Sequence, residues 1–206
     1  MTLRAAMTLW AAMTLRATLA LQTALLAVCC SALAVAPAVS RSEPLAPPEP
    51  SGYRMEDYRT PTPATLTGAR VVTTAQAEQL WKDGAVFIDV LPYVARPANL
   101  PPGTIWQEKV RNDIPGSLWL ADTGYGELAA VTEAYFRKGL ERTTAGDFAK
   151  PLVFYCLKSC WMSWNAAKRA LTMGYRNVAW YPDGTDGWEA AGLPLKEAHP
   201  APADGE

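Results

Sequence analysis

Histidine is almost missing from this sequence, and cysteine is scarce in the part that is predicted to fold. The only histidine among 206 residues is His199, in a tail rich in proline and alanine where we expect it to be solvated. The predicted domain holds two cysteines, Cys156 and Cys160. Two sulfurs are too few for a closed zinc site, which takes four ligands, so we predict no metal site.

The sequence also lacks an excess of charge of either sign. Lysine and arginine number 19 and aspartate and glutamate 20, which gives a formal net charge of −1 at pH 7. Binding to nucleic acid needs a concentrated basic face, and the sequence has none. Apolar residues make up 50% of the chain, which is enough for the core of one ordinary domain. We therefore expect one domain and no nucleic-acid partner.

The first 40 residues have the order of a secretory signal. They carry Arg4 and Arg16 but no acidic residue, then an apolar run from Leu19, and then small residues up to Ser40. We predict a signal peptide over residues 1–40 that is removed on export to the periplasm, with no membrane segment afterwards. The alternatives are an uncleaved anchor helix and a later translation start. Export to an oxidising compartment permits disulfides.

Proline is concentrated in the segment that follows the signal. Residues 41–70 contain six prolines and few large apolar side chains, so we predict a proline-rich linker that behaves as an extended tether. The linker either holds the domain away from a partner or is only a spacer. Residues 71–198 form the predicted domain, and residues 199–206 are expected to be a disordered tail.

Strands and helices alternate along the predicted domain. Apolar runs predict strands, and apolar residues spaced three and four apart predict helices. Predicted strands cover residues 85–90, 118–120, 152–155 and 177–181, and predicted helices cover about 74–82, 127–140 and 163–173. This alternation is typical of an α/β domain with a central, mainly parallel sheet flanked by helices. Ligands bind such sheets at the carboxyl ends of the strands, where Asp89, Cys156 and Asp183 stand.

The stretch from residue 153 to residue 173 carries the predicted catalytic site. Cys156 ends a strand and a helix follows soon after it, so loop N–H groups and the helix dipole favour a thiolate or a bound anion there. Cys160 is close enough along the loop for a reversible disulfide with Cys156, in which the two act as attacking and resolving thiols. A buried structural thiol is the alternative for Cys156.

Four further residues are predicted to bind the substrate. Lys158 is the only cation of the loop and can attract an anion, unless it is simply solvated. Trp161 offers an aromatic platform to a planar ligand, or packs against the domain. Asp89 orients the loop by accepting N–H bonds, or caps a helix. Ser159, in the middle of the loop, completes this set.

The order of these features resembles the rhodanese-like superfamily over most of residues 71–195. The matching pieces are FIDV with Asp89, the IPGS turn, FYC with Cys156, the NAA start of a helix, and the DG and GLP turns near the end. The resemblance implies a rhodanese-like domain in which Cys156 is the nucleophile. In that family the nucleophile accepts a sulfane sulfur as a persulfide, and loop amides cradle the anion.

A narrower resemblance lies in the loop itself. The C-x3-C-W spacing of Cys156, Cys160 and Trp161 is similar to the exported CXXCW-motif proteins associated with catabolism that depends on pyrroloquinoline quinone (PQQ). This resemblance implies a role in periplasmic alcohol oxidation. It also implies a quinoprotein dehydrogenase or a transporter component as partner, and association with PQQ rather than a covalently bound cofactor.

The loop departs from the patterns of its relatives at several positions. Ser159 or Cys160 replaces the usual central glycine, and Met162 stands where a phosphatase-type loop needs an arginine to clamp an oxyanion. Asp113 replaces the histidine that commonly precedes IPG. These departures argue against a phosphatase.

The connection over residues 91–112 is long and contains aromatic and basic residues, so we expect either a lid or rim over the site or a passive loop. Two functions remain open at this level. One is an enzyme that uses Cys156 for sulfur transfer or thiol–disulfide chemistry on a small sulfur or thiol substrate. The other is a non-catalytic binding module for a quinoprotein dehydrogenase, its cofactor or a transporter.

Overall fold

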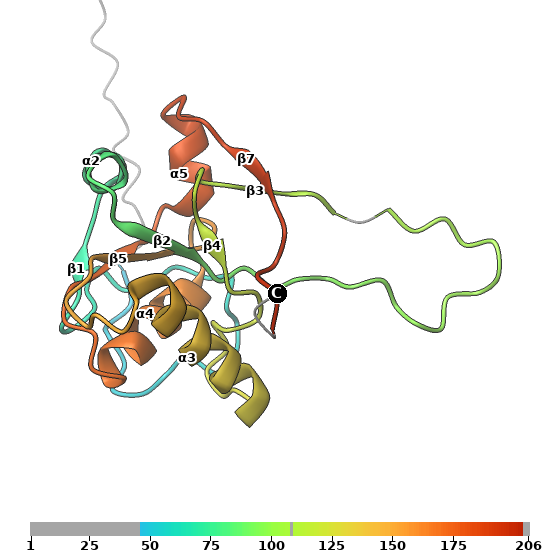
Figure 1. Cartoon of the computed structure of the whole chain (residues 1–206), viewed down its shortest axis with the longest axis horizontal. Coiled ribbons are helices and arrows are strands. Elements are labelled where there is room, and N and C mark those ends of the chain that lie inside the picture. The colour runs from blue at the N-terminus through green and yellow to red at the C-terminus, as the bar shows by residue number, and fades with distance from the viewer. Residues whose placement is uncertain (1–45, 108, 204–206) are drawn as a thin grey trace, which may run out of the picture. The chain divides into compact units, whose positions relative to one another are not determined.

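Five short strands form a parallel sheet in the order β1-β6-β5-β2-β4 (Figure 1). The structure is a computed structural model that describes residues 46–107 and 109–203, so the predicted signal peptide lies outside the described residues. The strands are β1 (Arg70–Val71), β2 (Val86–Asp89), β4 (Leu118–Trp119), β5 (Leu152–Tyr155) and β6 (Val178–Tyr181). All four neighbouring pairs run parallel.

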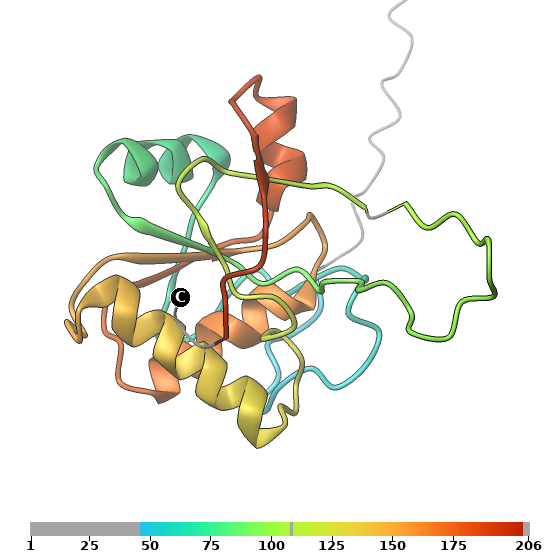
Figure 2. The same ribbon diagram turned by 45° about the vertical axis from the view of Figure 1, so that its right-hand side comes forward.

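Helices cover both faces of this sheet. They are α2 (Thr74–Lys82), α3 (Ala130–Thr144), α4 (Trp161–Thr172) and α5 (Gly184–Ala190). Figure 2 shows α2 and α5 on one face and α3 and α4 on the other. The predicted α/β architecture, a parallel sheet between helices, is confirmed. No helix in the described part of the chain is both long and apolar enough to cross a membrane.

The central strands are buried on both faces, which explains why they are continuous apolar runs in the sequence. In β5, Leu152 and Phe154 point to the core under α3 and α4, and Val153 and Tyr155 point to the core under α2 and α5. All four side chains are fully buried. The strand that leads to Cys156 is therefore held from both sides, and so is the position of the cysteine.

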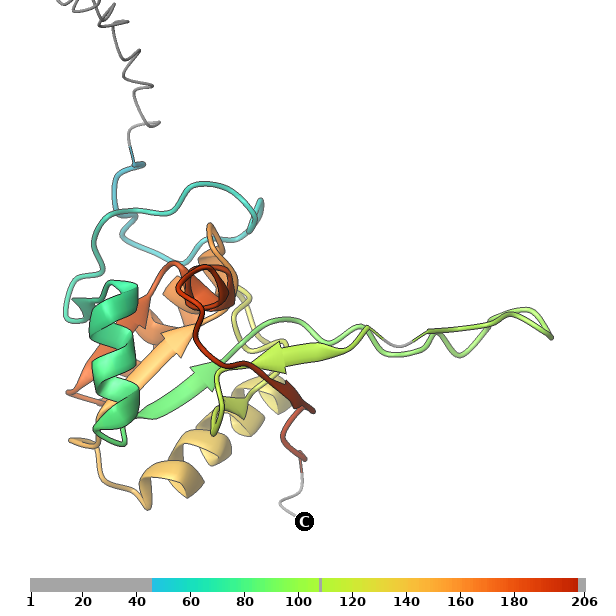
Figure 3. The same ribbon diagram turned by 90° about the horizontal axis from the view of Figure 1, so that it is seen from above.

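A two-stranded antiparallel ribbon lies beside the main sheet. It pairs β3 (Arg111–Asp113) with β7 (Lys196–Ala198). The connection between β2 and β3 projects away from the body of the domain (Figure 1 and Figure 3). The expectation that this connection forms a lid over the site is therefore wrong for its middle part, although its two ends lie close to the site.

Two predicted elements differ from the observed ones for identifiable reasons. The stretch after Asp183 was expected to be a turn because it contains two glycines, but it forms α5, which buries Trp188 against Phe87 and Tyr181. The helix predicted over residues 127–140 begins later and runs to Thr144. In both cases tertiary packing outweighs local preference.

The prediction of an extended tether before residue 71 is wrong for the part that the structure describes. Residues 50–66, here called the strap, lie along α4. Asn165 holds the strap through two hydrogen bonds to the backbone of Arg54, both 2.9 Å long. The indole N–H of Trp164 donates to Thr65 O at 3.1 Å, and Lys168 Nζ donates to Pro50 O at 3.2 Å. Long-range contacts therefore order a segment whose own sequence is poor in core residues.

The tail is also ordered where the structure describes it. The N–H of Ala201 donates to Trp119 O and its carbonyl accepts from the hydroxyl of Tyr135, both at 2.8 Å. The prediction of disorder is wrong for residues 199–203, and residues 204–206 lie outside the described part. His199 is exposed, as expected, with a relative side-chain exposure of 81%.

Candidate functional site

The ends of β2, β5 and β6 meet at one edge of the sheet. Asp89, Tyr155 and Tyr181 are paired in register across these three adjacent strands. Cys156 comes directly after β5 and Asp183 comes shortly after β6, so the strand-end residues singled out in the sequence lie at this edge. Parallel strands that carry their loops at a common edge give the usual place for a ligand site.

Cys156 and Cys160 lie together in the loop between β5 and α4. Both are free thiols with 0% and 1% of their surface exposed. The two thiols interact, and each shifts the pKa of the other. The predicted disulfide is not formed in this structure. Its formation from the two thiols would release both protons and two electrons.

The two thiols differ in their tendency to ionise. The neighbouring Cys156 thiol, and then the N–H groups of Met162 and Leu157, lower the pKa of Cys160 to about 6. Burial, the neighbouring Cys160 sulfur and the charge of Asp89 raise the pKa of Cys156. The two pKa shifts therefore run in opposite directions, downward for Cys160 and upward for Cys156.

Lys158 and Ser159 occupy the turn between the two cysteines. The Lys158 side chain points to α5, with Nζ 4.0 Å from Asp183 Oδ1, and its N–H donates to Asp186 Oδ2 at 2.8 Å. The role of Lys158 in attracting an anion to the loop stays a prediction. Ser159 has φ 54°, in the left-handed region that favours glycine. Its backbone thus holds a conformation that glycine would adopt at less cost.

Trp161 is buried beneath the strap, so its ring is not available as a platform in this conformation. Only 3% of its surface is exposed. Its indole N–H lies 3.1 Å from both Thr60 Oγ1 and Pro61 O, and its backbone N–H donates to Tyr58 O at 2.9 Å. The guanidinium of Arg54 lies over the ring at 5.3 Å from its centroid. The strap therefore covers the start of α4, directly after Cys160.

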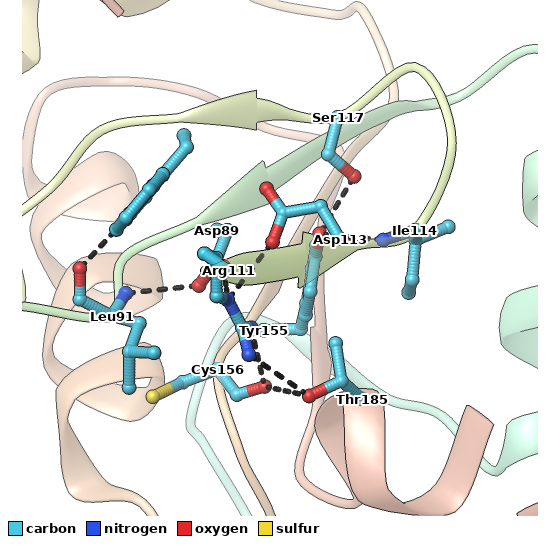
Figure 4. A network of polar contacts seen from close by, with 10 residues as sticks. Asp89, Leu91, Arg111, Asp113, Ile114, Ser117, Tyr155, Cys156 and Thr185 are labelled. Carbon is cyan, nitrogen blue, oxygen red and sulfur yellow. Dashed lines mark hydrogen bonds and ion pairs between the residues drawn. The ribbon is translucent and has the colours of Figure 1, made fainter. Parts of the chain in front are cut away.

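A buried ionic cluster supports the cysteine loop from behind, and Figure 4 shows its members. Arg111 Nε lies 2.7 Å from Asp89 Oδ2 and 2.9 Å from Asp113 Oδ1. The same guanidinium donates to Thr185 Oγ1 at 3.2 Å and to Cys156 O at 3.5 Å. Asp89 therefore orients the loop through Arg111, rather than by accepting N–H bonds from it, while its second oxygen caps the backbone of Leu91.

Asp113 is held as a neutral acid in this cluster. Burial and the nearby charge of Asp89 raise its pKa to about 9. Neither of its carboxyl oxygens has a hydrogen-bond partner in suitable geometry, although Oδ1 lies 2.9 Å from Arg111 Nε. One negative charge on Asp89 thus balances the single positive charge of Arg111.

Sequence reasoning missed three residues that hold the loop. Arg111 was noted only as part of a long connection. Gly184 and Thr185, at the start of α5, pack on the backbone of Cys156, and the N–H of Thr185 donates to Cys156 O at 3.1 Å. The only signals in the sequence were that Gly184 belongs to a DG pair and that Arg111 is a charged residue two positions before Asp113.

A cleft of about 370 Å³ lies beside the loop, which contributes Leu157 to its lining. Its walls come from the two ends of the β2–β3 connection, from the loop and from α5. They include Leu91, Tyr93, Lys109, Arg111, Trp119, Leu157, Thr185, Asp186 and Glu189. Neither thiol opens into this cleft in the conformation described. Among residues 46–107 and 109–203, no group of three or more His, Cys, Asp or Glu side chains is placed to hold a metal ion.

The parallel sheet and the cysteine loop between β5 and α4 define an α/β domain of the rhodanese type. Residues 73–191, more than half of the chain, match the rhodanese-like domain, so the chain belongs to this family. A comparison with curated proteins gives no match.

Several solved structures are similar to the chain at low sequence identity. The polysulfide-sulfur transferase homodimer of Wolinella succinogenes is 17% identical, over 63% of this chain and 79% of that chain, with a TM-score of 0.40. The thiosulfate sulfurtransferase of Pseudomonas aeruginosa is 20% identical, over 64% of this chain and 21% of that chain, with a TM-score of 0.42. A human single-domain sulfurtransferase is 19% identical, over 59% and 96%, with a TM-score of 0.35.

Proposed function

We propose that this rhodanese-like domain transfers sulfane sulfur from a small anionic donor through the pair Cys156 and Cys160. The observation that carries the proposal is the contact between two free thiols in the loop between β5 and α4. The N–H group of Leu157 lowers the pKa of both thiols and that of Met162 lowers the pKa of Cys160, so the surrounding backbone favours a thiolate or a persulfide there. The family supports sulfur chemistry at this place in the fold.

The proposal is tested with the reduced full-length protein and thiosulfate. We expect the protein to gain the mass of one sulfur, to release sulfite, and to form thiocyanate when cyanide is added. The control is a double variant, Cys156→Ser with Cys160→Ser, which should do none of these. If the wild type gains no sulfur and forms no thiocyanate above that control, from thiosulfate or from polysulfide, sulfur transfer is rejected.

We further propose that the protein acts in the periplasm, in PQQ-dependent alcohol oxidation. The order of charged, apolar and small residues over residues 1–40 supports export, and the C-x3-C-W spacing supports the narrower assignment. A quinoprotein dehydrogenase or a transporter component is then the expected partner, with PQQ bound without a covalent link. Cell fractionation tests the location, and calorimetry with PQQ and with a purified quinoprotein dehydrogenase tests the association. Recovery of the protein only in the cytoplasm rejects the proposed location. The absence of measurable heat of binding rejects the proposed association.

A non-catalytic binding module is the second candidate, and the burial of both thiols favours it. A thiol that meets no solvent cannot react until the structure opens. Alkylation of the native protein separates the two functions. If iodoacetamide modifies the pair within minutes, the site opens readily and chemistry is favoured. If the pair stays unmodified over a day while the unfolded protein reacts, the thiols remain buried in the native protein. They then have a structural role, and the binding module is favoured.

A further inference from the structure

Arg169, on α4, is a buried cation without an acidic partner. Only 6% of its surface is exposed, and it forms no ion pair with a carboxylate in the part of the chain that the structure describes. Instead, Nη1 donates to Thr123 O at 2.8 Å, and Nη2 donates to Tyr125 O at 2.8 Å and to Gly126 O at 3.1 Å. Arginine is rarely buried unless a negative charge accompanies it, so three carbonyl dipoles leave this positive charge only partly compensated.

The guanidinium of Arg169 still has a donor to offer. Its Nε makes no hydrogen bond to any residue that the structure describes, and this nitrogen is not fully enclosed. Arg169 contributes to the lining of a cleft of about 530 Å³, which shares no lining residue with the cleft beside the cysteine loop. Pockets for small molecules commonly have volumes of about 300–1,000 Å³, so the cleft is large enough for a small ligand.

The lining of this cleft combines positive charge with apolar surface. Arg137, on α3, adds a second guanidinium. The ring of Tyr53, in the strap, lies against the guanidinium of Arg169, with its centroid 4.7 Å from Cζ. Leu128 and Met173 supply aliphatic side chains. A ligand that has both an anionic group and an apolar body can use both kinds of surface, whereas a bare inorganic anion uses only the charges.

Two glutamates also line the cleft, and their charges oppose an anion. Glu133 is 48% exposed and lies 3.4 Å from Nη2 of Arg137, which offsets part of its charge, and Glu127 is exposed as well. Water and salt screen exposed charges far more than buried ones. The buried charge of Arg169 therefore acts on a ligand in contact with it more strongly than either glutamate does.

We propose that this cleft binds a small organic carboxylate, with Arg169 as the main cationic contact and Arg137 as the second. Guanidinium and carboxylate groups are both planar and match each other in shape and charge. The backbone that holds Arg169 is fixed in advance, because an added Cβ on Gly126 would overlap the carbonyl of Arg54. The ligand therefore meets a site that needs little rearrangement. This site is separate from the cysteine loop, and the proposal does not depend on sulfur transfer.

Titration calorimetry of the full-length protein with benzoate tests the proposal. Sodium chloride keeps the ionic strength constant, so that general screening does not imitate binding. We expect saturable binding with a Kd of about 1 mM or lower, which is within the ligand efficiency of so small a compound. Benzamide, which has nearly the same shape but no charge, should bind at least about tenfold more weakly. Equal binding of benzamide, or of inorganic phosphate, overturns the assignment to an organic carboxylate.

Variants then locate the bound benzoate. Arg169→Gln should weaken binding at least about tenfold, because a hydrogen bond between charged groups is lost. Arg137→Gln should weaken it about two- to fivefold, and Glu133→Gln should strengthen it by a similar factor, because both side chains are about half exposed. Arg142→Gln is the matched control, since it removes an exposed cation from the same helix outside the cleft.

The two α3 variants keep the test decisive if Arg169→Gln fails to fold. Arg137 and Glu133 are exposed, so their replacement should leave the urea denaturation of the protein nearly unchanged. A purely structural Arg169 gives no reason for benzoate affinity to respond to either change. The proposal is overturned if the wild type shows no saturable binding. It is also overturned if Arg137→Gln and Glu133→Gln bind benzoate as Arg142→Gln does.

Discussion

Arg111 Nε donates to Asp89 Oδ2 across 2.7 Å, and the two side chains are 9% and 0% exposed. The same guanidinium reaches the carbonyl of Cys156 at 3.5 Å. One ion pair thus ties the end of β2 to the start of the cysteine loop. Because the pair is buried, its loss should be felt both in the stability of the domain and in the position of the loop.

Replacing Arg111 by methionine leaves the Asp89 carboxylate buried without its partner. We expect the free energy of unfolding to fall by about 3–5 kcal/mol. Denaturation in urea measures this change. The control is Arg137→Met, which removes an exposed pair with Glu133 at 3.4 Å and should cost under about 1 kcal/mol. An equally small loss for Arg111→Met would contradict a structural role for the buried pair.

Replacing Asp113 by asparagine should change how stability depends on pH. The pKa of Asp113 is about 9 in the folded protein, against an ordinary value of 3.8. Between these values the folded state binds the extra proton, so this group lowers stability as pH rises, by up to about 1.4 kcal/mol per pH unit. Asp113→Asn should therefore be more stable than the wild type at pH 8 and closer to it at pH 4. Parallel stability curves for the two proteins would show that Asp113 titrates normally.

Replacing Gly184 by alanine should displace the cysteine loop. Gly184 has φ 53°, and an added Cβ would overlap the backbone carbonyl of Cys156. We expect a loss of roughly 2 kcal/mol or more, together with a changed rate of thiol alkylation. Gly192 offers the matched control because it has φ 72° and open space around its Cβ position. If the two variants lose the same stability, the close approach of residue 184 to the Cys156 carbonyl does not contribute to the loss.

Replacing Ser159 by glycine should stabilise the domain. A side chain in the left-handed region costs roughly 1–2 kcal/mol, and the greater freedom of glycine in the unfolded chain returns part of this. We expect a net gain of about 0.5–1 kcal/mol in the free energy of unfolding. Ala145, which ends α3 with φ 54°, should respond to the same change by a similar amount. A gain at Ala145 with a loss at Ser159 would assign the serine side chain a role of its own.

Replacing Asn165 by alanine should loosen the strap. The change removes three hydrogen bonds, two to Arg54 and one to Gly124 O at 3.0 Å. We expect a loss of about 1–3 kcal/mol and faster alkylation of the buried thiols by iodoacetamide. Thr172→Ala, on the exposed side of the same helix, should change neither quantity. Unchanged alkylation in a clearly destabilised Asn165→Ala would mean that the strap does not control access.

The central sheet was predictable from the sequence because its strands are apolar runs buried on two faces. Strands β1, β3 and β7 were not, since two or three residues at an edge leave no pattern. The position of Cys156 followed from the strand that precedes it. The cluster of Arg111, Asp89 and Asp113 did not, because its partners lie up to 24 residues apart and only the fold brings them together. That the strap is ordered could not be predicted for the same reason, since its hydrogen bonds to α4 join residues roughly 100 positions apart.

The docked strap determines where a recombinant fragment of this protein can begin. The family match starts at residue 73, yet the indole N–H groups of Trp161 and Trp164 find their acceptors between residues 60 and 65. A clone trimmed to the match would leave two buried indole donors unsatisfied and expose the apolar side of α4. Such a fragment should express poorly and aggregate. A clone that starts near residue 46 retains these contacts. Because Trp161 and Trp164 bind the strap, tryptophan fluorescence should report whether the strap is docked or released.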